Sequence, residues 1–219
     1  MAGYFITFEG GEGNGKTTQS RLLAKHLRAK GYEVVETREP GGTKGSEAIR
    51  HFLLSGKTEA IGPQIEAYLI AAARLAHLEE VIRPALKNGS VVICDRFIDS
   101  TRVYQGLNPQ ISQAWLEALL ALVVSETMPN ITFLLDCPVS IAIERAILRR
   151  GQENADRFEK EALSLHEARR QAFLCLAKKE TKRFRIIDGG ITPLEIAALI
   201  AQSCDEAMIK QEAKSCAKN

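Results

Sequence analysis

The residues with the clearest chemical potential lie near the start of the chain, in a glycine-rich run that ends in lysine and threonine. From residue 10 this run fits G-x-x-x-x-G-K-[ST] at every fixed position, and it follows the apolar segment 4–8 directly. In such a loop, backbone N–H groups turn toward phosphate oxygens, the lysine reaches the terminal phosphates, and the hydroxyl binds Mg²⁺. The sequence therefore predicts a P-loop that binds a nucleoside triphosphate through Gly10, Gly11, Glu12, Gly13, Asn14, Gly15, Lys16, Thr17 and Thr18.

Charged residues also follow the predicted strands, at the point where each strand ends. Glu9 follows the first apolar run, Arg38 lies after the second, and Asp95 and Arg96 come after the third. Parallel sheets bind their ligands at the carboxyl ends of the strands. We therefore expect these groups around the bound phosphates, with Asp95 and Thr17 as the candidate Mg²⁺ ligands.

A sheet must position these groups, and the chain contains apolar, β-branched-rich runs of strand length. They are nearly continuous rather than alternating, which is typical of parallel strands buried on both faces, and the segments between them suit helical crossovers. We predict an α/β fold with a five-stranded, mainly parallel sheet and helices on both faces. The expected strands are 4–8, 34–37, 91–94, 131–135 and 184–187, and the expected helices are 16–30, 63–88, 112–124, 140–150, 159–179 and 193–210.

Length and composition limit the function. The 219 residues suit a single domain, 1–219, with a polar tail from residue 211 that we expect to fray. A net charge of +2 without a massed basic patch argues against nucleic acid as the main partner. The odd number of cysteines shows no C-x-x-C pairing, and the apolar stretch 118–124 is far shorter than the roughly 20 residues of a membrane helix. Because Met1 leads into the first strand without a signal-like segment, we expect a cytoplasmic protein with no membrane partner.

Four motifs in this order resemble the thymidylate kinase family. They are F-E-G-x-x-G-x-G-K-T-T from residue 8, T-R-E-P-G-G-T from residue 37, A-A-A-R from residue 71 and D-R-F-x-x-S-T-x-x-Y-Q-G from residue 95. The resemblance implies a P-loop NTPase fold, a homodimer, and the transfer of the γ-phosphate of ATP to dTMP, with Mg²⁺ as cofactor. ATP and dTMP are then the small-molecule partners.

An acceptor that is itself a phosphate needs guanidinium groups with bidentate geometry. The resemblance places Arg38 and Arg96 on the acceptor phosphate, and Glu9 on the deoxyribose 3′-hydroxyl or a Mg²⁺-bound water. The alternatives from the residues alone are an Arg38–Glu39 surface pair, an Arg96–Asp95 strand-end salt bridge and a solvated Glu9.

The base and sugar site is predicted from the second and third motifs. The resemblance implies that Arg74 binds a carbonyl of thymine. Ile70 lies on the same helix face, at the position where the family commonly has a Phe that stacks on the base. Gln105 can make a bidentate contact with a pyrimidine edge, Tyr104 can fill the space of a ribose 2′-hydroxyl, and Ser100 and Thr101 are small polar liners. Phe97 and Val103 are expected to border the same site, at positions where the family usually has other residues.

The transition state of phosphoryl transfer needs a further cation, and the variable P-loop positions contain no arginine. The basic segment 144–151, followed by Asp156-Arg157, resembles the lid of the bacterial type, so we expect a lid over about 140–160. Arg149 and Arg150 are the candidate catalytic arginines, beside Lys16, Arg96 and Glu9. Arg145 and Arg157 are the alternatives, and a solvated basic helix is the simplest other interpretation.

Two other functions remain open at this stage. One is a kinase for another pyrimidine nucleotide or nucleoside, because Ile70, Phe97 and Val103 depart from the family pattern. The other, in a different class, is a P-loop switch or assembly ATPase. In such a protein Arg38, Arg74 and Gln105 would have no function in substrate binding.

Overall fold

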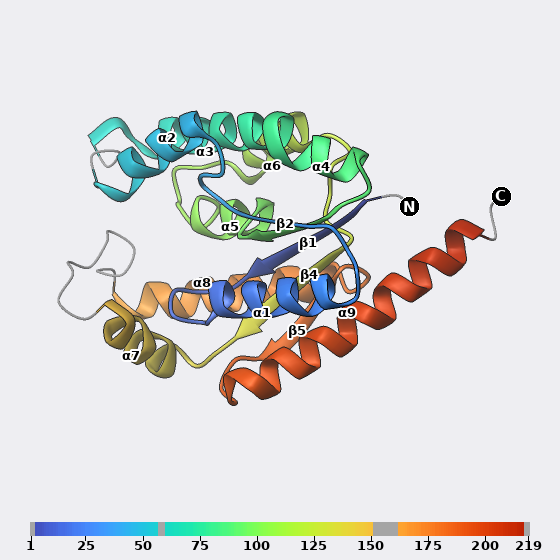
Figure 1. The fold of residues 1–219 in the computed structure, drawn as a ribbon. Coiled ribbons are helices and arrows are strands. Elements are labelled where there is room, and N and C mark those ends of the chain that lie inside the picture. The colour runs from blue at the N-terminus through green and yellow to red at the C-terminus, as the bar shows by residue number, and fades with distance from the viewer. Residues whose placement is uncertain (1–2, 57–59, 151–161, 217–219) are drawn as a thin grey trace.

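The computed structural model describes residues 3–56, 60–150 and 162–216, and it contains a single five-stranded sheet (Figure 1). Every strand pairs in parallel, in the order β2-β3-β1-β4-β5. This confirms the predicted α/β fold. The strands are β1 (Tyr4–Glu9), β2 (Val34–Arg38), β3 (Val91–Asp95), β4 (Ile131–Asp136) and β5 (Phe184–Asp188).

Each strand ends one residue later than the sequence predicted, and the last residue is charged in every case. β1 is central: Ile6 lies opposite Ile93 of β3 and Ile131 of β4, and all six β1 residues are buried. β2 lies at the edge and is only partly buried. The strand ends therefore bring Glu9, Arg38 and Asp95 to one edge of the sheet, as parallel pairing requires.

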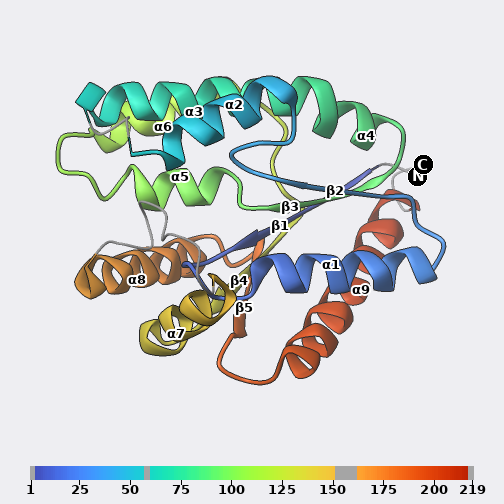
Figure 2. The ribbon, with the colours of Figure 1, turned by 60° about the vertical axis from the view of Figure 1, so that its left-hand side comes forward.

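Successive side chains of β1 point to opposite faces of the sheet, and each face has its own apolar cluster. Tyr4, Ile6 and Phe8 pack with residues of α1 (Lys16–Ala29) and α9 (Pro193–Cys216). Phe5 faces the other way, toward α3 (Pro63–His77), α5 (Ile98–Tyr104) and α6 (Gln113–Val124). Figures 1 and 2 show these two helix layers on either side of the sheet. A third cluster joins α5 and α8 (Leu163–Lys179) to β4.

The structure corrects two helix predictions and contains two helices that the sequence analysis did not predict. The expected helix 63–88 consists of α3, a π-helical segment η2 (Leu78–Ile82) and α4 (Arg83–Lys87) in direct succession. The helix expected to end at 210 continues as α9 to Cys216, and the fraying expected from residue 211 stays a prediction. The sequence analysis missed α2 (Lys44–Leu54) and α5, which are short. Thr43 caps α2 by accepting a hydrogen bond from Ser46 N.

The remaining helix next to the site is α7 (Val139–Arg150), which lies beside the P-loop. The structure contains no disulfide among its described cysteines, and Cys94, Cys137 and Cys204 are buried thiols. None of the described helices combines the length and the apolar character needed to cross a membrane.

Candidate active site

The P-loop connects β1 to α1, and its glycines lie where the backbone passes close to neighbouring atoms. Gly13 has a φ of 73°, and a Cβ placed there would lie 1.8 Å from Ala142 O of α7. Only glycine fits this approach. Asn14 anchors the loop to the sheet, because its Nδ2 donates to Leu135 O at 2.5 Å.

Lys16 lies at the start of α1 with its ammonium folded onto the loop. Its Nζ donates to Gly10 O at 3.1 Å and to Gly11 O at 2.7 Å, and the residue is only 6% exposed. Burial, and then the nearby charge of Arg96, lower the pKa of Lys16 to about 8. A triphosphate in the loop would supply the opposite charge that this ammonium lacks.

Thr17 and Asp95 lie together, as the sequence predicted for a Mg²⁺ site. Thr17 Oγ1 donates to Asp95 Oδ2 at 2.5 Å. A hydroxyl and a carboxylate beside a phosphate loop are the hard oxygen donors that Mg²⁺ prefers, and Mg²⁺ usually takes one or two protein ligands plus phosphate oxygens. The donor set therefore fits this ion, although the described residues contain no cluster of three or more His, Cys, Asp or Glu side chains that could hold a metal unaided.

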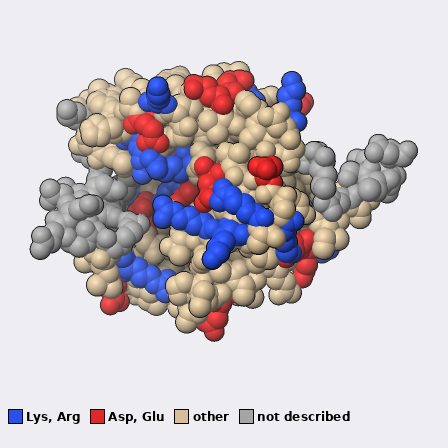
Figure 3. Space-filling view, viewed as in Figure 1, with Lys and Arg blue, Asp and Glu red and all other residues tan. Residues whose placement is uncertain are grey.

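Two hollows meet at this edge of the sheet. The donor hollow, of about 650 Å³, lies over the P-loop and the start of α1. The acceptor pocket, of about 100 Å³, lies between α2, α3 and α5. Both are lined by Glu12, Glu39, Arg50 and Arg96. Figure 3 shows basic and acidic side chains meeting in the hollowed middle of this face.

Arg96 occupies the wall between the hollows. It has a φ of 68°, in the left-handed region that few non-glycine residues adopt, and such strain often occurs at functional sites. Its guanidinium donates to Glu12 Oε1 at 2.6 Å, to Gly10 O and Ser100 Oγ at 3.0 Å, and to the Tyr104 hydroxyl at 3.2 Å. Burial has the largest single effect and lowers the pKa of Arg96, but Glu12, Tyr104, Asp95 and Glu9 together outweigh burial, so the net pKa is raised. Its acidic partner is thus Glu12, and not Asp95.

Two further arginines lie nearby. Arg38 borders the donor hollow, where its Nη2 contacts both oxygens of Glu47 at 3.0 Å rather than Glu39. Arg50, on α2, was not predicted; it lines both hollows and donates to Pro40 O at 3.0 Å. Burial, and then Arg38, lower its pKa. The signal that could have revealed Arg50 is the apolar spacing of α2 itself, which the sequence analysis did not recognise as a helix.

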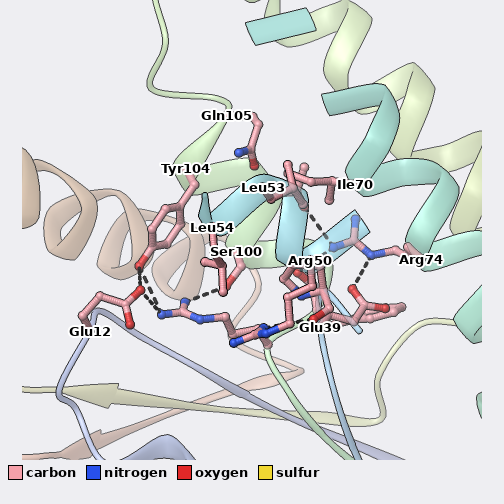
Figure 4. Close-up of a pocket in the computed structure, with 14 residues that line it drawn as sticks. Glu12, Glu39, Arg50, Leu53, Leu54, Ile70, Arg74, Ser100, Tyr104 and Gln105 are labelled. Carbon is pink, nitrogen blue, oxygen red and sulfur yellow. Dashed lines mark hydrogen bonds and ion pairs between the residues drawn. The ribbon is translucent and has the colours of Figure 1, made fainter. Parts of the chain in front are cut away.

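The far end of the acceptor pocket is built around Arg74. Its Nε donates to Glu39 Oε2 at 2.6 Å, and its Nη2 donates to Phe97 O and Thr101 Oγ1 (Figure 4). Its Nη1 is buried and has no hydrogen-bond partner among the residues that the structure describes. Ile70, 9% exposed, lies in the same pocket wall. An unpaired donor in a pocket is costly unless a ligand satisfies it.

The T-x-x-Y-Q motif lines the same pocket. Tyr104 donates its hydroxyl to Glu12 Oε1 at 3.0 Å. Gln105 Nε2 donates to Glu66 Oε1 at 3.0 Å, which engages one of the two protons of that nitrogen, and the bidentate contact with a base stays a prediction. Phe97 lines the pocket as expected. Val103 does not: it packs against Leu134 in the core, because α5 turns that side of the helix toward the sheet.

Glu9 is completely buried beneath α5. Its carboxylate accepts hydrogen bonds from Phe97 N at 2.8 Å, Ser100 N at 3.2 Å and Ser100 Oγ at 2.6 Å. Burial, and then the charge of Asp99, raise the pKa of Glu9 to about 7. Glu9 lines neither hollow, so it is not the solvated carboxylate considered above, and its contact with the sugar stays a prediction.

The predicted lid lies partly outside the described residues. α7 ends at Arg150, but the side chains of Arg149 and Arg150 and all of 151–161, including Arg157, are outside them. Arg145 lines the donor hollow, and its Nη1 donates to Gly189 O at 2.6 Å.

A P-loop, a Thr–Asp pair suited to Mg²⁺ and an arginine-lined second pocket together define a P-loop kinase whose acceptor carries a phosphate. A family model described as thymidylate kinase matches residues 8–200. The chain is 58% identical over 213 residues to a thymidylate kinase of Bartonella henselae, covering 96% of this chain and 99% of that one. Over 212 residues it is 55% identical to the enzyme of Bartonella quintana, with the same coverage. The crystal structure of thymidylate kinase from Ehrlichia chaffeensis superposes with a TM-score of 0.74 at 32% identity, covering 94% of this chain and 99% of that chain. This chain belongs to the thymidylate kinase family.

Proposed function

We propose how this chain carries out the reaction of its family, in which the γ-phosphate of ATP is transferred to dTMP to give dTDP and ADP. The observation that carries the proposal is the wall shared by the two hollows: Arg96 and Arg50 border both the P-loop side and the pocket that ends at Arg74. A phosphoryl group of a nucleotide bound in the donor hollow can therefore be transferred to a phosphate bound in the acceptor pocket. Family membership favours neither a different pyrimidine kinase nor a P-loop switch.

On the donor side, the P-loop amides and Lys16 hold the phosphates of ATP. Thr17 and Asp95 would hold Mg²⁺, which would neutralise negative charge on the phosphates of ATP. Lys16 exchanges its contacts with the Gly10 and Gly11 carbonyls for phosphate oxygens, and the negative charge of the phosphates raises its pKa again.

On the acceptor side, Arg96 and Arg50 hold the phosphate of dTMP, with Arg38 near the donor hollow. In the structure the carboxylate of Glu12 accepts a hydrogen bond from Arg96 Nη2. A phosphate is also an anion that accepts from a guanidinium, so it can replace this carboxylate. Thymine enters the pocket beside Ile70, and its C4 carbonyl accepts a hydrogen bond from Arg74 Nη1. Tyr104 limits the space at the sugar, which favours deoxyribose.

We propose that the protein is a homodimer and that it lies in the cytoplasm. α3 exposes an apolar stripe whose members include Ile65 (48% exposed), Tyr68 (52%) and Leu75 (43%). Tyr68 packs edge-on against Trp115 of α6, so the stripe continues onto a second helix. Exposed apolar surface of this kind is typical of a protein interface.

The test is a coupled assay of ADP release with MgATP and dTMP, dUMP, CMP or thymidine as acceptor. We expect the highest kcat/KM for dTMP, a lower value for dUMP, and little turnover with CMP or thymidine. ADP release that does not depend on any acceptor would instead indicate an ATPase.

The lid arginines give a separate prediction for catalysis. Replacing Arg149 and Arg150 together with Ala removes the cation proposed to meet the transferring phosphoryl group, so kcat should fall by about 10³ while the KM for ATP changes little. Steady-state kinetics at varied ATP measures both constants. If kcat survives, Arg145, Arg157 or Arg96 carries this charge.

A further inference from the structure

A buried polar pair, Glu66 and Gln105, lies next to the acceptor pocket: Gln105 lines the pocket, and Glu66 contacts Gln105 without lining it. Gln105 Nε2 donates to Glu66 Oε1 at 3.0 Å, and the two residues are 5% and 6% exposed. Glu66 lies in the first turn of α3, and Gln105 directly follows α5. The pair therefore joins the two helices that bring Ile70, Arg74 and Thr101 to the pocket.

The hydrogen bond fixes which way the Gln105 amide faces. A carboxylate accepts hydrogen bonds and does not donate them, whereas a carboxamide has a donor end and an acceptor end. With Nε2 directed at Glu66, the carbonyl oxygen Oε1 is the end that remains for a ligand, and no donor in the described part of the chain contacts it. Figure 4 shows the Gln105 side chain reaching into the pocket. A flipped amide would set two oxygens against each other with no proton between them.

Gln105 and Arg74 then present a defined pattern to the edge of a base. Gln105 offers an acceptor, and the unpartnered Nη1 of Arg74 offers a donor. A pyrimidine with a proton on N3 and a carbonyl at C4 complements this pattern. Cytosine reverses it at both positions, because its N3 is an acceptor and its C4 carries an amino group, and each mismatch leaves polar groups unpaired.

We propose that Glu66 is a positioning residue that holds the carbonyl of Gln105 toward the base and so makes the pocket specific for a pyrimidine with a proton on N3. This inference rests on the proposed function and adds to it a source of base specificity. Glu66 touches no substrate; it acts through the orientation of Gln105.

The first test compares substrates at saturating MgATP in the purified full-length chain. Glu66→Gln lets residue 66 donate as well as accept, so the Gln105 amide can turn, and the ratio of kcat/KM for dTMP to that for dCMP should fall by about tenfold or more. The KM for ATP should stay unchanged. Glu33→Gln, the same chemical change at an exposed position before β2, is the matched control and should leave the ratio within about twofold of wild type. An unchanged ratio in Glu66→Gln overturns the proposal.

A second variant tests whether Glu66 acts through Gln105. Gln105→Leu removes both ends of the amide, so adding Glu66→Gln in this background should change the ratio no further. An additional change of similar size would show that Glu66 acts by another route, which also overturns the proposal.

A probe on the wild-type protein avoids any folding defect of the variants. The deoxynucleotides of 2-pyrimidinone and 2-pyridone both lack a substituent at position 4, and they differ only in having N or C–H at position 3. A carbonyl oxygen facing this position should favour the pyridone, whereas an NH₂ group would favour the pyrimidinone and refute the proposal. If the wild type releases no ADP with dTMP, the proposed function itself fails; if dTMP is turned over normally and the pyrimidinone is preferred, this inference alone fails.

Discussion

Arg74 shows how one buried side chain can be fixed by the protein and still be available to a ligand. Its Nε and Nη2 are held by Glu39, Phe97 O and Thr101, while Nη1 stays buried and unpaired. Glu39 is itself held, because His77 Nδ1 contacts its other oxygen at 3.1 Å. The guanidinium therefore cannot rotate away, and its remaining donor is set before the substrate arrives.

This arrangement predicts that Arg74→Lys weakens acceptor binding selectively. Lysine keeps the charge but not the planar fork, so it cannot bind Glu39 and a base carbonyl in the same geometry. We expect the KM for dTMP to rise by about tenfold or more, with little change in the KM for ATP. Steady-state kinetics measures both, and Arg28→Lys on the exposed side of α1 serves as the control. An equal rise in both constants would indicate a general structural defect.

Glu9 gives a prediction for pH. Its pKa of about 7 in the folded chain lies above the ordinary value of 4.5, so the folded state binds this proton more tightly than the unfolded state does. Its contribution to stability is therefore complete below about pH 4.5 and is lost as the pH rises through 7.

Compared with Glu9→Gln, the wild type should lose on the order of 1–3 kcal/mol of unfolding free energy between pH 4.5 and 7. Urea unfolding at a series of pH values measures this difference, and the other titrating groups cancel because both proteins share them. Parallel pH profiles for the two proteins would contradict the assignment.

At the level of whole elements, α5 is the short helix on which much of the acceptor pocket depends. Asp99 has no solvent exposure, and Arg183, just before β5, holds it through Nη1–Oδ2 at 2.7 Å and Nη2–Oδ1 at 2.9 Å. Arg183 Nη1 also donates to Thr132 of β4 at 2.6 Å. This ion pair ties α5 to two strands, and so sets the height of Ser100 and Thr101 above the sheet.

Removing one member of this pair should cost more than removing both. Arg183→Met removes the bidentate partner of the buried Asp99 carboxylate and leaves it only the contact with Arg102 Nη1 at 3.2 Å, so the loss should reach up to about 3–5 kcal/mol, the cost of breaking a buried ion pair. Adding Asp99→Asn should recover part of that loss. Chemical unfolding of the two single variants and the double variant completes the cycle. Additive losses would mean that Arg183 stabilises the fold independently of Asp99.

At the scale of the molecule, one of the two helix layers exposes an apolar stripe on α3. α1 and α9 cover one face of the sheet, and α3 lies over the other (Figures 1 and 2). The apolar stripe of α3 is exposed. The stripe lies on the same helix as Ile70 and Arg74, which point the other way into the pocket. Association through α3 would therefore brace the helix that carries these base-site residues.

A charge placed in this stripe should separate the proposed dimer. Ile65→Glu together with Leu75→Glu would bury two carboxylates in the interface, and light scattering after size exclusion should then report a monomer. Ile209→Glu is the control, because Ile209 is 65% exposed on α9, across the sheet. A wild-type monomer, or a dimer that survives both substitutions, would refute this interface.

The sequence determined the features that short-range chemistry controls. The P-loop needs glycine at its fixed positions 10 and 15, where φ is 134° and 84°, and that requirement is visible in the spacing alone. Gly13 stands at a variable position of the motif, and only the approach of α7 explains why it is a glycine. The five strands are visible because parallel strands buried on both faces must be almost continuously apolar. Their parallel pairing then brings Glu9, Asp95 and Arg96 to one edge, as predicted.

Only the tertiary structure decided which charges pair. Arg96 binds Glu12 rather than Asp95, Arg38 binds Glu47 rather than Glu39, and Gln105 binds Glu66. The physical reason is that a charged or amide side chain accepts many partners, and the choice depends on how α2, α3 and α5 pack over the strand ends. Glu12 and Arg96 are far apart along the chain, so no local spacing signals their contact, and the same packing gives Arg50 its place between the two hollows.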